Sequence, residues 1–469
     1  MWIKNLFRTL IFGFVFVVLL GRIYNVLSWK DTAGDYISSL NSYYELEEDI
    51  VDVVFLGSSH CYCSVNHSIL WDEHGISSFS LAISGQDLAS TYHCLVESLK
   101  TQSPEVVMIE MYGSVFQGYQ DTGNLYRNTL SLKPSKNAYN AVKSMVEEGT
   151  EWDYLLKWPI VHTRYAELKK QDFQKNTIPY VGYTSDFETN SILEIVPYTG
   201  EPAETLWEES EYWIQKMIDF AKESQTNICF FIAPYSAPDY EQMRIKRAEQ
   251  IAKANNIPFV NMIDISEDLG MDVENDFMDW MHTNVYGAEK VTNYLGEYLK
   301  QNYELENHYG DPKYELWDKD LLARQHEMLN VQMAEITNVA EYLEMAGNLD
   351  EYTVIVTTNG QYQGEGADLP PALGALGIGS EFYQAPYLWI IQNQEMIYAA
   401  AGEEIFYHMD MDKDEVLIGS SQGVKNVIVG EHNYCAAQNG INVVIYDNVL
   451  EKVADAVGFD AGSGYAAIR

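Results

Sequence analysis

The chain has 469 residues, of which 47% are hydrophobic and 13% aromatic, so it is long and apolar enough for two or three packed domains. Its formal net charge of −40 at pH 7 argues against binding nucleic acid, or an anionic membrane surface, through a basic face, because both need clustered Lys and Arg. We interpret the acidic excess as a means of solubility.

The first thirty residues differ in character from the rest of the chain. Lys4 and Arg8 precede a largely apolar run at 9–21, and the apolar character resumes after Arg22. This pattern predicts an uncleaved signal anchor that spans the membrane over residues 1–30, and a cleavable signal peptide is the alternative. The anchor is favoured because no small-x-small cleavage site follows the run. Positive charge on the short N-terminal side predicts that this end is cytoplasmic and that the bulk of the chain is outside.

Residues 31–303 are expected to form one α/β domain. From about residue 50, short apolar runs alternate with amphipathic segments, which predicts a doubly wound parallel sheet. The expected strands are 52–57, 77–83, 105–111, 227–233 and 257–261, and the expected helices are 87–101, 204–224, 238–255 and 287–303.

The first expected strand runs without a spacer into Gly57-Ser58-Ser59-His60, where it must turn sharply into a helix. A serine in this turn lies at the carboxyl edge of the sheet, where ligands bind in open α/β sheets. The position suits a nucleophile whose own backbone N–H can face an oxyanion. Because such turns are also common without any function, the turn by itself does not define a site.

A second motif lies just before the last helix of this domain, where Asp279 and His282 are three residues apart. This spacing allows the imidazole to reach the site while the carboxylate fixes its tautomer, as in a Ser-His-Asp relay. The two motifs are in the right order for such a relay, and we therefore favour catalysis over a purely structural role.

These motifs resemble the conserved blocks of the SGNH, or GDSL-like, hydrolases, whose last block is Asp-x-x-His. The resemblance implies that Ser59 is the nucleophile, His282 the general base and Asp279 its orienter. Residues 80–86 resemble the second block of the family, in which a glycine N–H joins the oxyanion hole. That role is implied for Gly85, together with the N–H of Ser59.

The chain departs from the family pattern in two places. Ser58 stands where the first block usually has Asp, as in the membrane-anchored branch that works on cell-surface polymers and includes the D-alanine transfer protein of teichoic acids. The third block should supply an asparagine after the strand at 106–109, but the chain has Glu110 there. Tyr112 or Ser114 would have to replace this side-chain oxyanion donor.

Residues 115–203 interrupt the alternation and are expected to form an insertion at the rim of the site. Aromatic residues are scattered between its polar ones: Trp152, Trp158, Tyr165, Tyr180 and Tyr183. Aromatic faces can stack on sugar rings, but the same rings can equally pack a small core within the insertion.

No metal, cofactor or disulfide framework is expected. The five cysteines are Cys61, Cys63, Cys94, Cys229 and Cys435, a set too odd and sparse to imply a disulfide framework. Cys61 and Cys63 are interpreted as small buried side chains that line the first helix. The Cys-x-Cys pair lacks the second pair that a zinc site needs. Residues 408–415 begin like a calcium loop but lack the glycine at its sixth position and the glutamate at its twelfth, which favours an acidic turn between two strands.

The rest of the chain is expected to form a linker, 304–350, and a smaller α+β domain, 351–469. Apolar residues at helical spacing predict one long linker helix that ends at Gly347. In the last domain, strands are expected at 352–358, 387–391, 423–430 and 439–447, and a short helix at 369–377. These segments resemble the interleukin-like epithelial–mesenchymal transition inducer domain, in a permuted order. The resemblance implies an accessory domain that folds independently and binds carbohydrate.

The sequence therefore predicts a bacterial, membrane-anchored, extracytoplasmic serine esterase or O-acyltransferase. Its expected substrate is a cell-surface or extracellular polysaccharide that carries acyl, above all acetyl, groups. The alternative is a catalytically degenerate scaffold of the same family that binds and tethers glycan during export, and the missing third-block asparagine motivates it.

Overall fold

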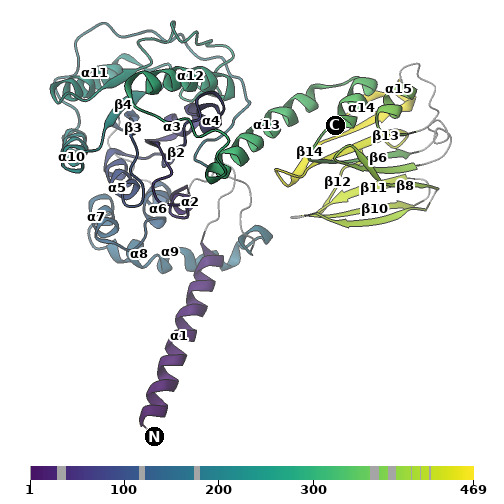
Figure 1. Ribbon diagram of the computed structural model, residues 1–469, viewed down its shortest axis with the longest axis horizontal. Helices are drawn as coiled ribbons and strands as arrows, with labels where there is room; N and C mark the ends of the chain where they lie inside the picture. Colours follow the sequence, from purple (N-terminus) through teal and green to yellow (C-terminus); the bar gives the residue numbers. More distant parts are fainter. Residues whose placement is uncertain are drawn as a thin grey trace. The chain divides into compact units, whose positions relative to one another are not determined.

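The computed structural model describes residues 2–28, 39–115, 122–173, 180–359, 369–378, 387–402, 404–411, 414–421 and 424–469. The chain divides into two compact units, Met1–Leu321 (unit 1) and Leu322–Arg469 (unit 2) (Figure 1).

Unit 1 begins with a single apolar helix, α1 (Trp2–Leu27), which continues without a break through Arg22. Its segment Lys4–Leu27 has 24 residues and is almost entirely unburied. At about 1.5 Å per residue this segment is roughly 36 Å long, enough to cross a hydrocarbon core of about 30 Å. The helix is thus suited to a membrane anchor or a signal sequence. Residues 29 and 30 of the predicted anchor lie outside the described residues.

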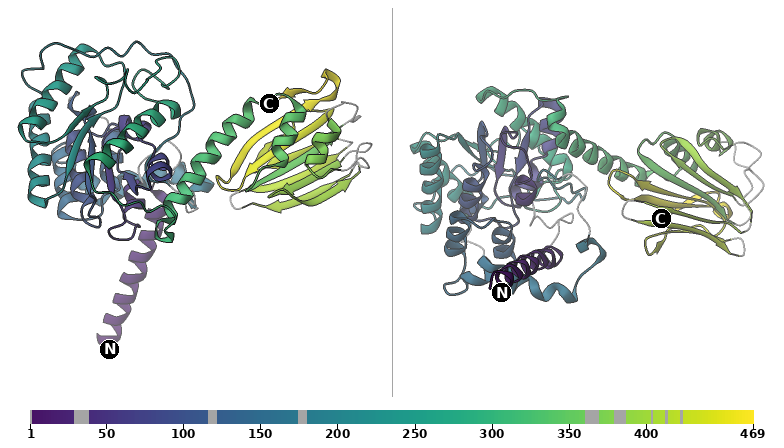
Figure 2. Two further views of the ribbon diagram at one scale, coloured as in Figure 1. Left: turned by 45° about the horizontal axis from the view of Figure 1, so that its top comes forward. Right: turned by 60° about the horizontal axis from the view of Figure 1, so that its bottom comes forward.

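A five-stranded parallel sheet with the order β2-β1-β3-β4-β5 forms the centre of unit 1 (Figures 1 and 2). The strands are β1 (Val53–Leu56), β2 (Ser78–Ser80), β3 (Val106–Glu110), β4 (Ile228–Ile232) and β5 (Phe259–Asn261). β1, β3 and β4 are buried along their whole length, and their residues are all apolar except Glu110 at the end of β3. The predicted parallel sheet is confirmed.

Helices cover both faces of this sheet, because alternate residues of a strand point to opposite sides. Val54 packs in a cluster with residues of α5 (Leu88–Ser98), α10 (Glu208–Ser224) and α11 (Asp239–Ala254). Phe55 packs in a second cluster with residues of α3 (Ser59–Ser64), α4 (His67–His74) and α12 (Val285–Asn302). A short helix, α2 (Ser39–Tyr43), contributes to the first cluster.

The register of the sheet brings three loops to one edge. β1 pairs with β2 through Phe55 and Ser80, and with β3 through Leu56 and Ile109. Because the strands are parallel, the segments that follow β1, β2 and β3 all emerge at the same carboxyl edge.

The insertion is largely helical. Its elements are α6 (Thr122–Leu130), α7 (Lys136–Met145), α8 (Glu151–Leu156) and α9 (Trp158–Val161), followed by the 3-10 turns η3 (His162–Ala166) and η4 (Lys170–Phe173). Among its aromatic rings, Trp152 and Tyr165 are exposed, whereas Tyr183 is buried.

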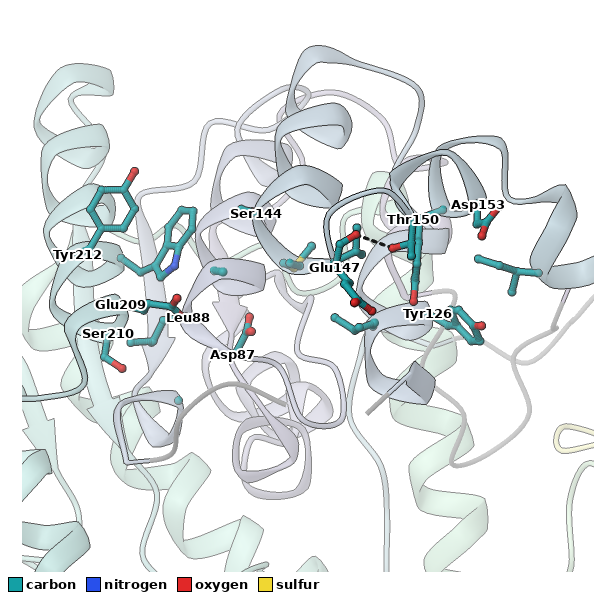
Figure 3. A pocket seen from close by; sticks show the side chains of 18 of the residues that line it. Asp87, Leu88, Tyr126, Ser144, Glu147, Thr150, Asp153, Glu209, Ser210 and Tyr212 are labelled. Carbon is teal, nitrogen blue, oxygen red and sulfur yellow. Dashed lines mark hydrogen bonds between the residues drawn. The ribbon is translucent and has the colours of Figure 1, made fainter. Parts of the chain in front are cut away.

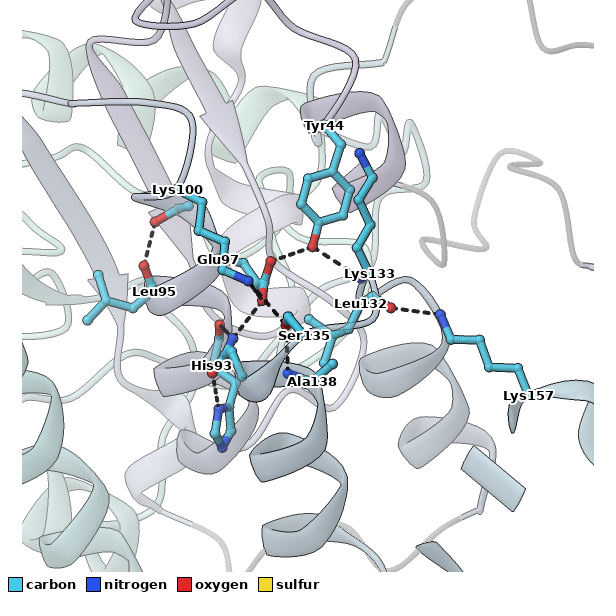
Figure 4. A network of polar contacts seen from close by, with 12 residues as sticks. Tyr44, His93, Leu95, Glu97, Lys100, Leu132, Lys133, Ser135, Ala138 and Lys157 are labelled. Atoms are coloured by element: carbon cyan, nitrogen blue, oxygen red, sulfur yellow. Dashed lines mark hydrogen bonds and ion pairs between the residues drawn. The ribbon is translucent and has the colours of Figure 1, made fainter. Parts of the chain in front are cut away.

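A polar network fixes the insertion to α5 (Figure 4). The buried Glu97 carboxylate accepts hydrogen bonds from the Tyr44 hydroxyl at 2.6 Å and from Asn137 Nδ2 at 2.8 Å, and it pairs with Lys100. Lys157 Nζ donates to the carbonyl oxygens of Leu130 and Leu132, which ties α8 to the end of α6. The insertion is therefore anchored to the α/β core through charged and polar contacts.

The expected long helix after residue 320 is in fact two helices, α13 (Glu315–Glu335) and α14 (Val339–Gly347). Asn338 has an extended backbone, and its side chain accepts from the N–H groups of Ala340 and Glu341. Asparagine in this role starts a new helix, so the expectation of one continuous helix is wrong.

Two antiparallel sheets build the rest of unit 2, with the orders β15-β14-β13-β6-β7-β8 and β12-β11-β10-β9. They pack against each other, and α14 and α15 (Leu369–Ala375) pack on the other face of the larger sheet. The strands are β6 (Tyr352–Asn359), β7 (Tyr387–Gln392), β8 (Glu395–Ala401), β9 (Phe406–Asp410), β10 (Glu415–Ser421), β11 (Val424–Val429), β12 (His432–Asn433), β13 (Gly440–Asp447), β14 (Lys452–Asp460) and β15 (Ala466–Ile468).

Candidate active site

The turn from β1 into α3 positions Ser59 at the carboxyl edge of the sheet. Ser59 is the first residue of α3, and the Ser58 side chain caps the helix by accepting from the N–H of His60 at 3.3 Å. Gly57 has φ +143°, and a Cβ atom there would lie 2.6 Å from Cβ of Glu110. Only glycine therefore allows this strand to turn directly into this helix.

Three residues far apart in sequence meet at this turn. His282 Nε2 lies 2.7 Å from Ser59 Oγ, and His282 Nδ1 lies 2.9 Å from Asp279 Oδ2. A proton on Nδ1 directed at the carboxylate leaves Nε2 free to accept the serine proton. The structure thus brings together the three residues that the sequence singled out, in the order that a relay requires.

The Asp279 carboxylate is oriented by its own turn. Asp279 Oδ1 accepts from the N–H groups of Met281 at 2.7 Å and His282 at 2.9 Å. Partial burial alone would raise the pKa of Asp279, but the hydrogen bonds from the His282 ring and from these backbone groups hold its pKa below the usual value. The carboxylate therefore stays ionised, and the exposure of 46% of its side chain also favours the charged form.

The loop that carries His282 is attached to α3. Thr283 Oγ1 lies 3.1 Å from the carbonyl oxygen of Cys63 and 3.0 Å from Ser64 Oγ. Asn284 caps α12 by accepting from the N–H groups of Tyr286 and Gly287. The segment that carries His282 is thus fixed both to α12 and to α3, the helix that begins with Ser59.

Gly85 lies beside the nucleophile turn, in the loop after β2, with φ +62°. Gln86 Oε1 accepts from the N–H of Gly57 at 2.9 Å, and the Tyr62 hydroxyl is hydrogen-bonded to the side chains of Ser84 and Ser59. Within the described part of the chain, the N–H groups of Ser59 and Gly85 donate to no protein acceptor. Both amides are therefore available to an oxyanion.

Ser58 and Glu110, the two residues that depart from the pattern which the sequence resembles, contact each other. Ser58 Oγ donates to Glu110 Oε2 at 3.0 Å, and Glu110 Oε1 accepts from the N–H of Tyr112 at 2.6 Å. Ser58 and Glu110 therefore form one buried hydrogen-bonded pair next to Ser59. Ser114 is not the missing oxyanion donor, because it is fully buried and its hydroxyl donates to the carbonyl oxygen of Met111.

Glu110 is an unusual acid for a core position. Burial raises its pKa to about 7, against the opposing effect of the hydrogen bonds from Tyr112 and Ser58. Near neutral pH the carboxyl is therefore divided between its protonated and ionised forms. The protonated form can donate to Ser58 Oγ while its other oxygen still accepts from Tyr112.

We expect the contribution of Glu110 to the free energy of unfolding of unit 1 to fall as the pH rises from about 4.5 to about 7. Between these values the folded chain retains a proton on Glu110 that the unfolded chain has released, so the unfolded state binds fewer protons. Glu110→Gln imitates the protonated form and should remove this contribution, which amounts to a few kcal/mol across the pH range. Denaturant titrations at several pH values measure the difference. Glu105→Gln, at an exposed position just before β3, is the control. If the free energy of unfolding of Glu110→Gln had the same pH dependence as that of the wild-type chain, the raised pKa of Glu110 would be contradicted.

Sequence reasoning missed His60 as part of the site. Its ring is fully buried, stacks on Tyr112 at 3.9 Å and lies 5.2 Å from the ring of His282. Burial first, and His282 second, lower the pKa of His60, so the ring is neutral. Among the described residues neither of its ring nitrogens has a hydrogen-bond partner. The available signal was its position directly after Ser59, which does not reveal where the ring points.

The thiols are buried as expected near the site, and none of the five cysteines, all of them described, forms a disulfide. In unit 2, His408, Asp410 and Glu415 could hold a metal ion, because their ligand atoms lie within 4.8 Å of one another. All three are exposed on the neighbouring strands β9 and β10 that flank the predicted acidic turn.

A cavity of about 1090 Å³ opens next to this edge of the sheet (Figure 3). It lies between the insertion, α5 and α10. One of its lining residues, Asp87, follows Gly85 by two positions in the chain. Its lining includes carboxylates (Asp87, Glu147, Asp153, Glu209), hydroxyl groups (Ser144, Thr150, Thr163, Ser210) and aromatic rings (Tyr126, Tyr154, Tyr212, Trp213). The described lining residues include no Lys or Arg.

No protein-family model and no curated protein matches the chain in sequence. Solved structures that are similar to it include a GDSL-like lipase from Bacteroides thetaiotaomicron, with 15% identity, coverage of 58% of this chain and 99% of that chain, and a TM-score of 0.31. An esterase from Pseudoalteromonas has 12% identity, coverage of 53% and 97%, and a TM-score of 0.27. An acetyl-xylooligosaccharide esterase mutant from Geobacillus has 14% identity, coverage of 55% and 96%, and a TM-score of 0.28.

Proposed function

We propose that the protein is a serine esterase or O-acyltransferase of the SGNH type that acts on acyl, mainly acetyl, groups of a cell-surface or extracellular polysaccharide. The observation that carries the proposal is the contact of 2.7 Å between Ser59 Oγ and His282 Nε2, with Asp279 on the other ring nitrogen. A serine, an imidazole and a carboxylate in this arrangement, at the carboxyl edge of a parallel sheet, form the machinery of acyl transfer.

In the proposed reaction, His282 Nε2 takes the proton of Ser59 as Oγ attacks the ester carbonyl carbon. The negative charge that develops on the carbonyl oxygen accepts hydrogen bonds from the N–H groups of Ser59 and Gly85. The C–O bond to the sugar then breaks, and His282 returns the proton to the departing sugar hydroxyl. The acyl group on Ser59 passes to water in hydrolysis, or to another hydroxyl in transfer.

A polysaccharide substrate is supported by the cavity beside the site. Carboxylates and hydroxyl groups accept and donate hydrogen bonds to sugar hydroxyls, and aromatic rings such as Tyr126 offer faces for stacking. Trp280, half exposed between Asp279 and His282, adds a ring at the edge of the relay itself. The four carboxylates in the lining favour a neutral polymer over a polyanionic one, because like charges repel.

The proposed place of action is outside the cytoplasmic membrane, with α1 as an uncleaved anchor whose N-terminal end is cytoplasmic. The length and apolar surface of α1 support this part of the proposal. Unit 2 is proposed to be a carbohydrate-binding accessory unit, on the basis of the sequence resemblance described above.

A serine-directed fluorophosphonate probe tests the function on the full-length chain. The wild-type chain and Ser58→Ala are expected to be labelled, and Ser59→Ala is not. Equal labelling of Ser59→Ala would identify another serine as the nucleophile. Absence of labelling in the wild-type chain would instead favour the alternative, a degenerate scaffold that binds and tethers glycan during export.

We expect Tyr126→Ala to raise KM for an acetylated oligosaccharide severalfold, because the loss of one stacking ring costs about 1 kcal/mol. Turnover of a small aryl acetate should be unchanged, since that substrate does not fill the cavity. Tyr139→Ala, on α7 of the same insertion and outside the cavity lining, is the matched control. Equal effects of both substitutions on the oligosaccharide would contradict the assignment of the cavity to glycan.

A further inference from the structure

The segment of the insertion from α9 to η4 contacts α1 and holds its carboxyl end. α9, η3 and η4 each contact α1. Arg164 Nη1 donates to the carbonyl oxygen of Leu27, the last residue of α1, at 2.7 Å, and its Nη2 pairs with Asp172 at 2.9 Å. Arg164 and Leu27 are both buried by this contact. The end of α1 is therefore held by the insertion.

The same part of the insertion exposes an unusual number of large apolar side chains. Five of them, which we call the 152–173 surface, are between 37% and 72% exposed: Trp152, Leu156, Trp158, Tyr165 and Phe173. α8 and α9 lie on the side of unit 1 from which α1 leaves, and they run across its axis (Figures 1 and 2). Exposed apolar side chains gathered in this way mark an interaction surface.

We propose that the 152–173 surface rests in the headgroup region of the membrane that α1 crosses, so that unit 1 is seated on the bilayer as well as tethered to it. The inference rests on the proposed membrane anchoring by α1. Because the apolar character of α1 resumes after Arg22 and ends at Leu27, we place Leu27 at the boundary between hydrocarbon and headgroups. Segments that contact this end of α1 lie at a similar depth, where Trp and Tyr are the preferred side chains.

Contact of the 152–173 surface with the membrane would also affect the proposed active site. The insertion is joined to α5 by the Glu97 network, and within the insertion Lys157 joins α8 to the end of α6 (Figure 4). The cavity beside the site is lined in part by Pro159, Ile160 and Thr163 of the same segment. A seated insertion therefore holds the cavity close to the membrane surface, which favours acyl groups on polymer that lies near the bilayer.

The test uses the full-length chain in liposomes of phosphatidylethanolamine and phosphatidylglycerol. Cys435→Ser removes the one cysteine that is partly exposed, and Tyr165→Cys or Phe173→Cys then carries an environment-sensitive fluorophore. The matched control is Tyr240→Cys, at an exposed position on α11, across unit 1 from α1 (Figure 1). We expect lipid-borne shallow nitroxides to quench the labels at 165 and 173 severalfold more than the label at 240.

Retention after an alkaline carbonate wash tests the anchoring by α1 separately from the contact of the 152–173 surface with the headgroups. Suppose that the chain is retained but its labels at 165 and 173 are quenched no more than the label at 240. This result would overturn the proposed contact of the 152–173 surface with the headgroups and would leave the anchoring by α1 intact. Release of the chain by carbonate would overturn both. Shielding of the labels from aqueous iodide without quenching by lipid would show that another protein surface covers the 152–173 surface, which also overturns the inference.

Discussion

Replacing Ser59 or His282 with alanine is expected to reduce turnover of an aryl acetate by roughly 10⁴-fold or more, because either change removes the activated nucleophile. Asp279→Asn should be about 10- to 100-fold less severe, since an imidazole that is poorly oriented still acts as a weak base. Steady-state kinetics with p-nitrophenyl acetate, on variants shown to be folded by circular dichroism, measure these effects.

Ser58→Ala is the matched control for this series. Ser58 is adjacent to Ser59 and buried, but its hydroxyl donates to Glu110 rather than facing His282. We expect this variant to retain most of its activity. If Ser58→Ala were inactive and Ser59→Ala active, the assignment of the nucleophile would be wrong.

The second large effect is expected in unit 2, where Asp447→Ala should destabilise the fold by about 3 kcal/mol. The Asp447 carboxylate is fully buried and accepts from His326 Nδ1 at 3.0 Å and from Asn330 Nδ2 at 2.8 Å. It also accepts from the N–H groups of Val449 and Leu450 at 2.9 Å. Alanine leaves all four donors without this acceptor, at the point where α13 packs on β13.

Hydrogen exchange of the full-length chain measures this loss. Amides of β6 and β13 should exchange about 10²-fold faster in Asp447→Ala than in the wild-type chain, if they exchange through unfolding of unit 2. Asp460→Ala removes a carboxylate that is partly exposed and accepts from the N–H of Gly462, and it should change exchange far less. Similar exchange in both variants would show that the buried network contributes little.

Much of unit 1 could be predicted because its signals are local. β1, β3 and β4 are buried on both faces and are apolar except for Glu110 at the end of β3, so these strands can be predicted without knowing their neighbours. The register of β1 with β2 and β3 was not needed to expect their ends at one edge, since parallel strands require it. The residues Ser59, Asp279 and His282 were found through short motifs at such an edge.

Features that depend on contacts between distant residues could not be predicted from the sequence. Ser58 and Glu110 looked like two separate departures from a pattern, and only the tertiary structure shows that they form one hydrogen-bonded pair. Asn338 stops and restarts a helix although the apolar spacing on both sides continues, because a cap is decided by backbone geometry.

By itself, the sequence determined the parallel sheet, the edge at which the relay residues lie and the presence of an apolar N-terminal helix, since each follows from local patterns of burial and turn chemistry. The tertiary structure decided which polar groups pair next to Ser59, that His60 is buried beside His282, and that the insertion holds the end of α1 through Arg164. These contacts join residues 52 to 222 positions apart in the chain, and no local pattern encodes them, because their free energy arises only when separate elements pack together.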